Sequence, residues 1–345
     1  MKSYYSPEHE KHHGQTELID GQMTPCFEKP ARVHQVLERL QNAQLGAIGE
    51  PREFGQAPLQ RVHSPAYLEF LASAWSRWAA LGRQQDALPL TWPARTTRSD
   101  VVPDAIDGAL GYYSLDAGVP ITAGTWEAAR ASANVALSAA AHLMDIGTGA
   151  SFALCRPPGH HAGVDTMAGY CYLNNAAIAT QYLRDQGARR VAVLDVDYHH
   201  GNGTQSIFYH RSDVLTLSLH ADPRVDYPFF LGHADERGAG AGLGYNQNYP
   251  LPHGTCWQSY EPALLSACDR AREFAPDVLV ISLGVDTFEH DPISKFRLVN
   301  DDYLRLGEHI ARIGCPTLFV MEGGYAVDDI GVNTVNVLTG FKQVA

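Results

Sequence analysis

Two carboxylates and an imidazole occur at every second position in residues 191–203, as Asp195, Asp197 and His199. The run before them, residues 191–194, is apolar and β-branched, which is typical of a strand buried on both faces. Because side chains alternate along a strand, we expect the three polar groups on one side of its carboxyl end, where open α/β sheets bind ligands. Carboxylates and an imidazole held together need a neutralising cation, so the spacing predicts a divalent metal site. The alternative is an Asp–His hydrogen bond that caps the next helix.

Four further motifs each follow an expected strand, and a parallel sheet would bring them to the same edge. They are residues 156–162 with His160 and His161, residues 169–175 with Tyr170, residues 282–287 with Asp286, and residues 322–325 with Tyr325. Asp286 would be a third metal ligand and leave a coordination position open for water. The histidine pair favours acid/base catalysis, and the Tyr325 hydroxyl could reach a developing oxyanion. Taken alone, the pair could be structural and Tyr170 could be core.

The elements that position these motifs alternate between strands and helices. We expect strands at 151–155, 190–194, 214–220, 278–283 and 317–321, and helices at 31–41, 64–78, 125–144, 175–186, 257–274 and 301–312. This alternation predicts an α/β fold, a three-layer α/β/α arrangement around a mostly parallel sheet. We expect one domain over residues 1–345, with loop insertions near 9–28, 83–125 and 222–257. The long segment after Gly82 is a candidate wall for a substrate channel.

Composition narrows the class of partner. The chain has 345 residues with 38 acidic and 26 basic side chains, a net charge of −12. Such a chain is a poor partner for nucleic acid or an anionic membrane, and its field favours a cationic substrate, although many proteins are acidic for solubility alone. No apolar run approaches the roughly 18 residues of a membrane span, the first residues lack signal-peptide features, and the six cysteines form no paired motif. We therefore expect a cytoplasmic protein.

Three histidines lie near the start of the chain, at His9, His12 and His13. Such a cluster could suggest metal binding, but we expect no matching acidic partners nearby. We interpret the segment as a loop that closes over the site or contacts a second subunit.

The ordered motifs over about residues 150–330 resemble the arginase/deacetylase fold, specifically its metal-dependent histone deacetylase branch. The resemblance implies a set of roles: zinc ligands Asp197, His199 and Asp286; catalytic His160, His161 and Tyr325; and substrate-binding Tyr170 with Gly169. Ferrous iron would suit the same ligands. Arginases carry a second Asp at the position of Gly201, so the resemblance favours a single metal ion.

Two further positions refine the resemblance. Asp195 would orient His160 and help Ser218 hold a monovalent cation such as K⁺. Histone deacetylases usually carry Asp at the position of Asn202, and an amide stabilises an imidazolium less, so we expect a lower pKa for His161. The bacterial acetylpolyamine amidohydrolases share an Asn here and resemble the whole chain more closely.

The subgroup implies a function. We expect a homodimer that deacetylates small cationic acetylated amines, such as acetylputrescine, acetylcadaverine and acetylspermidine, to acetate and free amine. The carboxylate for the distal ammonium would be one of Glu17, Asp104, Asp107 and Asp116. The alternatives are a lysine deacylase acting on acetylated peptides or proteins, and a metal-stabilised protein that binds acetylated amines without hydrolysing them.

Overall fold

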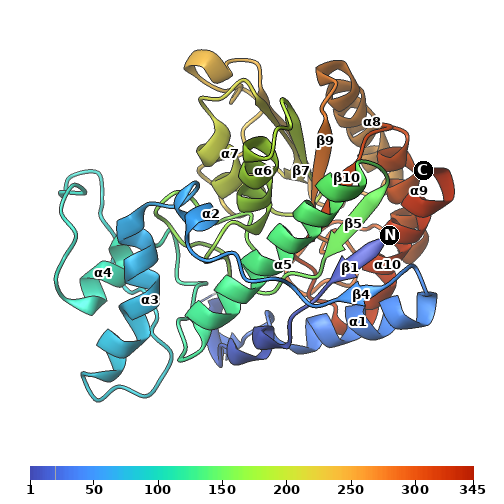
Figure 1. Ribbon diagram of the computed structural model, residues 1–345. Coiled ribbons are helices and arrows are strands. Elements are labelled where there is room, and N and C mark those ends of the chain that lie inside the picture. Colours follow the sequence, from blue (N-terminus) through green and yellow to red (C-terminus); the bar gives the residue numbers. More distant parts are fainter. Residues whose placement is uncertain (20) are drawn as a thin grey trace.

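One eight-stranded parallel sheet organises the chain. The computed structural model describes residues 1–19 and 21–345. The strand order is β4-β1-β5-β10-β9-β6-β7-β8, and every neighbouring pair of these described strands is parallel (Figure 1). The strands are β1 (Lys2–Tyr4), β4 (Ile48–Gly49), β5 (Ala150–Ala153), β6 (Val191–Asp195), β7 (Val214–Ala221), β8 (Asn246–Leu251), β9 (Val278–Leu283) and β10 (Thr317–Met321). A separate antiparallel hairpin joins β2 (Thr16–Ile19) and β3 (Gln22–Pro25).

Helices follow most of the strands. They are α1 (Ala31–Ala43), α2 (Ala57–Gln60), α3 (Pro65–Ala79), α4 (Ile106–Tyr112), α5 (Thr125–Ile146), α6 (Asn175–Asp185), α7 (Asn202–Phe208), α8 (Trp257–Phe274), α9 (Asn300–Ala311) and α10 (Val327–Val344), with 3-10 helices η1 (Pro7–Lys11) and η2 (Gly240–Gly242). Helices α3 and α4 project beyond the sheet at one side (Figure 1). None of the described helices has the length and apolar character needed to cross a membrane.

The sheet separates two apolar cores because its strands are apolar on both faces. Along β9, Val278 and Val280 point into a core shared with α3, α5 and α6, whereas Leu279 and Ile281 point into a core shared with α1, α8, α9 and α10. This alternation is the side-chain period of a strand. The predicted three-layer α/β/α fold with a mostly parallel sheet is confirmed.

The predicted central elements match the structure closely. The strands β9 and β10 and the helix α8 have the expected bounds, and α3 begins as expected, with Ser64 accepting a hydrogen bond from Tyr67 N–H. The strands β1, β4 and β8 were not predicted. They lie at or near the sheet edges, where short or polar strands carry little apolar signal.

The three expected loop insertions contain regular structure, so the prediction of loops there was too simple. Residues 9–28 include part of η1 and the β2–β3 hairpin, residues 83–125 include α4, and residues 222–257 include the edge strand β8.

His9 and His12 of the opening segment do not lie over the site, and a contact of this segment with a second subunit stays a prediction. His9 and His12 are buried, and His12 Nδ1 lies 3.0 Å from Thr125 Oγ1 at the start of α5. The strand β2 lines the central cavity instead, through Glu17 and its neighbours.

Candidate active site

Four loops meet at the carboxyl edge of the sheet because the strands that precede them are neighbours. The strands β5, β10, β9 and β6 lie side by side in that order, and each leads within a few residues into one of the predicted motifs. Asp195 at the end of β6 is opposite Ser282 of β9. The residues just beyond them, Asp197 and Asp286, therefore come together.

Asp197, His199 and Asp286 form one buried group whose ligand atoms lie within 4.8 Å of one another. His199 Nδ1 is 3.1 Å from Asp286 Oδ2 and 3.4 Å from Asp197 Oδ1. Burial and the Asp197 carboxylate raise the pKa of Asp286 to about 7, because a neighbouring negative charge disfavours ionisation. Carboxylate oxygens and an imidazole nitrogen in this arrangement fit a divalent ion such as Zn²⁺ or Fe²⁺.

Backbone groups hold the two carboxylates in place. Tyr198 N–H donates to Asp286 Oδ1, and Gly323 N–H donates to Asp197 Oδ2, both at 2.8 Å. A Cβ at residue 323 would lie 2.5 Å from an oxygen of each Asp. Only glycine lets the backbone approach the ligand group this closely.

Asp195 does not belong to the ligand group, although its position in the alternating run suggested the same side. Its Oδ2 lies 2.9 Å from His160 Nδ1, and its Oδ1 accepts a hydrogen bond from Asp197 N–H. Ser218 is opposite Asp195 in the neighbouring strand, but its hydroxyl contacts His220 and His200. Asp195 thus orients His160, while its link to Ser218 is through the strand pairing.

The two adjacent histidines have opposite electrostatic environments. Burial opposes a charge on His160, yet the Asp197 and Asp195 carboxylates raise its pKa to about 10. Burial and the positive charge of His160 lower the pKa of His161 well below its ordinary value. His161 Nδ1–H donates to Asn202 Oδ1 at 2.7 Å, which leaves Nε2 as an acceptor. The expected effect of Asn202, a pKa for His161 lower than a carboxylate partner would give, stays a prediction.

Glu322 fixes the turn that carries the histidines, a role that we did not predict. Its Oε2 accepts hydrogen bonds from Gly159 N–H at 2.6 Å and His160 N–H at 3.1 Å. The carboxylate is fully buried, and burial raises its pKa to about 7. The sequence does contain a signal for this role, because Glu322 directly follows the strand β10. We used the motif at this position only to identify Tyr325.

Tyr325 lies at the wall of the site. Its backbone N–H donates to Asp291 Oδ2 at 2.7 Å, and its ring centroid is 5.5 Å from that of Tyr170. The Arg32 guanidinium lies 4.7 Å from the centre of the same ring. These contacts with Tyr170 and Arg32 hold the ring that bears the hydroxyl.

A buried charge cluster supports the loops from behind. Arg156 Nε and Arg32 Nη1 both donate to Glu28 Oε1, at 2.7 and 2.9 Å. Arg32 also donates to the carbonyl oxygens of Glu322 and Gly324, at 2.5 and 2.6 Å. Burial opposes ionisation of Glu28, but the two arginines lower its pKa to about 2. The cluster therefore couples the segment before α1 to the loop that bears Tyr325.

A cavity of about 490 Å³ reaches His161, His199 and Tyr325. Tyr170 lines it as predicted, and Tyr227, which we did not predict, lines it too. The ring of Tyr227 lies edge-on to that of His161, with centroids 5.0 Å apart.

Gly169 brings the backbone close to His161, one of the two adjacent histidines. It has a φ of 45°, and a Cβ there would lie 2.5 Å from His161 Cδ2. A larger residue at this position would displace the imidazole.

Carboxylates from distant segments face the same cavity. Of the four acidic residues predicted for an ammonium, the structure brings Glu17 and Asp116 to the cavity lining. Asp107 pairs instead with Arg83, at 2.6 Å, and Asp104 is exposed outside the lining. Asp226 also lines the cavity and was not predicted.

An α/β fold with these motifs at the carboxyl edge of its sheet defines a class of hydrolases. Residues 26–341 match the histone deacetylase domain family, and the chain belongs to this family. It is thus a deacetylase of the metal-dependent type.

Similarity to particular relatives extends over the whole chain. The chain is 60% identical to acetylpolyamine amidohydrolase 1 of Pseudomonas aeruginosa, with all of both chains covered. It is 46% identical to acetylpolyamine amidohydrolase of Mycoplana ramosa, with 99% of each chain covered. A crystal structure of acetylpolyamine aminohydrolase from Burkholderia pseudomallei superposes with a TM-score of 0.95 at 40% identity, covering 100% of this chain and 99% of that one.

Proposed function

We propose that the protein hydrolyses the amide bond of N-acetylated polyamines and diamines, such as acetylputrescine, acetylcadaverine and acetylspermidine, to acetate and free amine. The observation that carries the proposal is one cavity that joins the metal-binding group to lining carboxylates. When the acetyl group of the substrate lies at the metal-binding group, its distal ammonium lies near the lining carboxylates. The relatives with 60% and 46% identity bear names of the same activity.

Asp197, His199 and Asp286 would hold the metal ion, for which Zn²⁺ and Fe²⁺ are the candidates. When bound, such an ion lowers the pKa of a coordinated water to about 7 and polarises the acetamide carbonyl.

The chain's own groups carry the protons. His161 is neutral because of its lowered pKa, and its Nε2 accepts the proton of the attacking water. The Tyr325 hydroxyl donates a hydrogen bond to the oxyanion that forms as water adds to the carbonyl. The histidine pair then returns a proton to the amine nitrogen as the carbon–nitrogen bond breaks, and acetate and amine leave.

Substrate selection follows from the charges around the cavity. Glu17 and Asp116 are acidic, and a distal ammonium would offset the energetic cost of keeping their carboxylates buried. Among the described lining residues, Lys295 is the one lysine or arginine. The balance favours a cationic amine over a neutral or anionic amide.

An acetate-release assay on a panel of acetylated amines tests the proposal. Protein stripped of metal with a chelator should be inactive, and addition of Zn²⁺ or Fe²⁺ should restore turnover. We expect kcat/KM for acetylputrescine to exceed that for an acetyl-lysine peptide by at least about tenfold. The reverse order would favour the lysine deacylase, and binding without acetate release would favour the non-catalytic binding protein.

Three finer expectations stay predictions. They are the homodimer, the cytoplasmic location and a K⁺ site at Asp195 and Ser218. Light scattering and metal analysis of the purified protein test the first and the third.

A further inference from the structure

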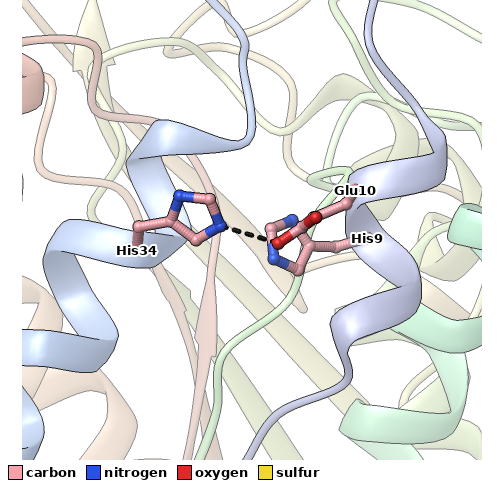
Figure 2. A group of neighbouring side chains, drawn as sticks. All are labelled: His9, Glu10 and His34. Carbon is pink, nitrogen blue, oxygen red and sulfur yellow. Dashed lines mark hydrogen bonds and ion pairs between the residues drawn. The ribbon is translucent and has the colours of Figure 1, made fainter.

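A second group of metal-ligating side chains lies apart from the catalytic group, between η1 and α1. His9 and Glu10 come from η1 and His34 from α1, and one ligand atom of each lies within 4.8 Å of the others. Figure 2 shows the two imidazoles on facing elements with the Glu10 carboxylate next to both. His34 Nε2 is 2.9 Å from Glu10 Oε1. The ring centroids of His9 and His34 are 5.5 Å apart. The expectation that these histidines have no acidic partner was wrong, because Glu10 directly follows His9, and the fold adds His34 from α1.

The burial of His9 without hydrogen-bond partners in the described part of the chain indicates a ligand. Its side chain is only 3% exposed, and neither ring nitrogen has a hydrogen-bond partner among the described residues. A buried polar group without a hydrogen-bond partner destabilises the fold, so a nitrogen lone pair of His9 is available to a cation. Burial, with the nearby Arg156 and His34 charges, lowers the pKa of His9 to about 4. The imidazole is therefore neutral at pH 7, the state that binds metals.

We infer that His9, Glu10 and His34 form a second metal site, which binds Zn²⁺ with two imidazole nitrogens and one carboxylate oxygen. Zinc takes these donors at about 2.0–2.2 Å in tetrahedral geometry, and water completes the fourth position on the exposed side. Imidazole donors exclude Mg²⁺ and Ca²⁺ as the preferred ions, since both prefer oxygen.

The site can contract onto an ion because only one of its ligands is fixed. His9 is held by burial, while Glu10 and His34 are exposed and free to turn toward it. The Glu10–His34 hydrogen bond already brings these two together. The metal would replace this bond and would also take up the orphan nitrogen of His9.

The position of the site indicates a structural role. The His9 carbonyl oxygen accepts a hydrogen bond from Arg156 Nη1 at 2.6 Å. On α1, Arg32 donates to the loop that bears Tyr325. An ion at the new site would link η1 to α1. It would thereby stabilise the positions of Arg156 and Arg32 from outside the cavity. It would therefore stabilise the fold without contacting substrate.

Zinc counting and thermal unfolding test the inference. We expect protein dialysed against about 10 μM free Zn²⁺ to hold two ions per chain, and His34→Ala and Glu10→Gln to hold one. Raising free Zn²⁺ from the level that fills the catalytic group should raise Tm by about 2 °C or more in the natural protein, and not in these variants. The matched control is His13→Ala, which removes an exposed histidine of the same segment outside the cluster and should keep both ions and the shift.

The outcomes separate this site from the catalytic group. Asp286→Ala should lose the catalytic ion and keep the His9 site, so one ion per chain should remain, and adding His34→Ala should remove it. Both Glu10 and His34 are exposed, so their variants are expected to fold. One ion per chain in the natural protein, or two in His34→Ala, would overturn the inference whatever the enzyme's activity.

Discussion

His161 Nδ1 lies 2.7 Å from the side-chain oxygen of Asn202. The Asn202 amide nitrogen donates to the His161 carbonyl oxygen at 3.4 Å, which orients the amide oxygen toward the ring. A neutral acceptor fixes the tautomer of the imidazole but stabilises its charged form less than a carboxylate would, and burial with the positive charge of His160 lowers the pKa of His161 well below its ordinary value. His161 therefore remains a base at low pH, in contrast to His160 beside Asp195.

Asn202→Asp should raise the pKa of His161, because a carboxylate stabilises the imidazolium. A neighbouring opposite charge shifts a pKa by about 1–3 units, so the acidic limb of the kcat/KM profile should move to higher pH by at least about one unit. The measurement is acetate release from pH 5 to 9. Asn42→Asp, an exposed position on α1 outside the cavity, adds the same charge as a control. An unmoved acidic limb would remove His161 from the role of base.

Tyr325→Phe should lower kcat by roughly a hundredfold or more with little change in KM. Losing one donor to an oxyanion costs about 2.7–4 kcal/mol in related sites, and the ring contacts with Tyr170 and Arg32 would persist in the variant. Steady-state kinetics on acetylputrescine check this, with Tyr209→Phe, which lies outside the cavity lining, as the control. A kcat within threefold of the natural protein would contradict the role.

Glu17→Gln should weaken binding of cationic substrates selectively. Glu17 is the better candidate for the ammonium, because its Oε1 accepts one backbone hydrogen bond from Phe27 N–H. The oxygens of Asp116, by contrast, accept three hydrogen bonds, from Tyr227, Gly118 and Gly169. A hydrogen bond to a charged group contributes about 1.5–3 kcal/mol, so KM for acetylputrescine should rise at least tenfold.

The controls for Glu17 are a substrate and a variant. N-acetylbutylamine lacks the distal ammonium, and its kcat/KM should change by less than about threefold in Glu17→Gln. Glu38→Gln, an exposed site on α1, should leave both substrates unaffected. An equal decrease of kcat/KM on both substrates would mean that Glu17 shapes the cavity and does not bind the ammonium.

The central fold and the ligand group could be predicted because their signals are local. The strands β9 and β10 are unbroken apolar runs, and each ligand follows such a run within a few residues. Strand β8 could not be found in this way, because its residues Asn246, Asn248 and Pro250 are atypical of a buried strand.

The supporting residues were missed because their partners are distant in sequence. Glu28 and Arg156 are 128 positions apart, yet they form a buried ion pair. Each alone resembles a solvated charge, and only the completed fold places them in contact. Tyr227 was missed for the same reason, since it lies in a long irregular segment that reaches the cavity only after β7 is in the sheet.

The Glu28 cluster predicts how stability depends on pH. Its folded pKa of about 2 lies below the ordinary value of 4.5, so its contribution is complete above about pH 4.5 and is lost as pH falls toward 2. A shift of this size corresponds to about 3 kcal/mol. Glu28→Gln would also leave Arg32 and Arg156 without a buried counter-charge, which costs about 3–5 kcal/mol.

Urea unfolding of both proteins between pH 7 and pH 3 checks this dependence. The difference in free energy of unfolding between the natural protein and Glu28→Gln should be constant from pH 7 to about pH 5. It should then narrow as pH falls toward 3, because Glu28 begins to protonate in the unfolded chain while the folded carboxylate stays charged. Titrating groups that do not interact with Glu28 are common to both proteins and cancel. The buried His9 and His12 do feel the Glu28 charge, but their folded pKa values of about 4 and about 3 keep them neutral over most of this range. A difference that stays constant down to pH 3 would mean that packing, and not the Glu28 charge, holds the two arginines.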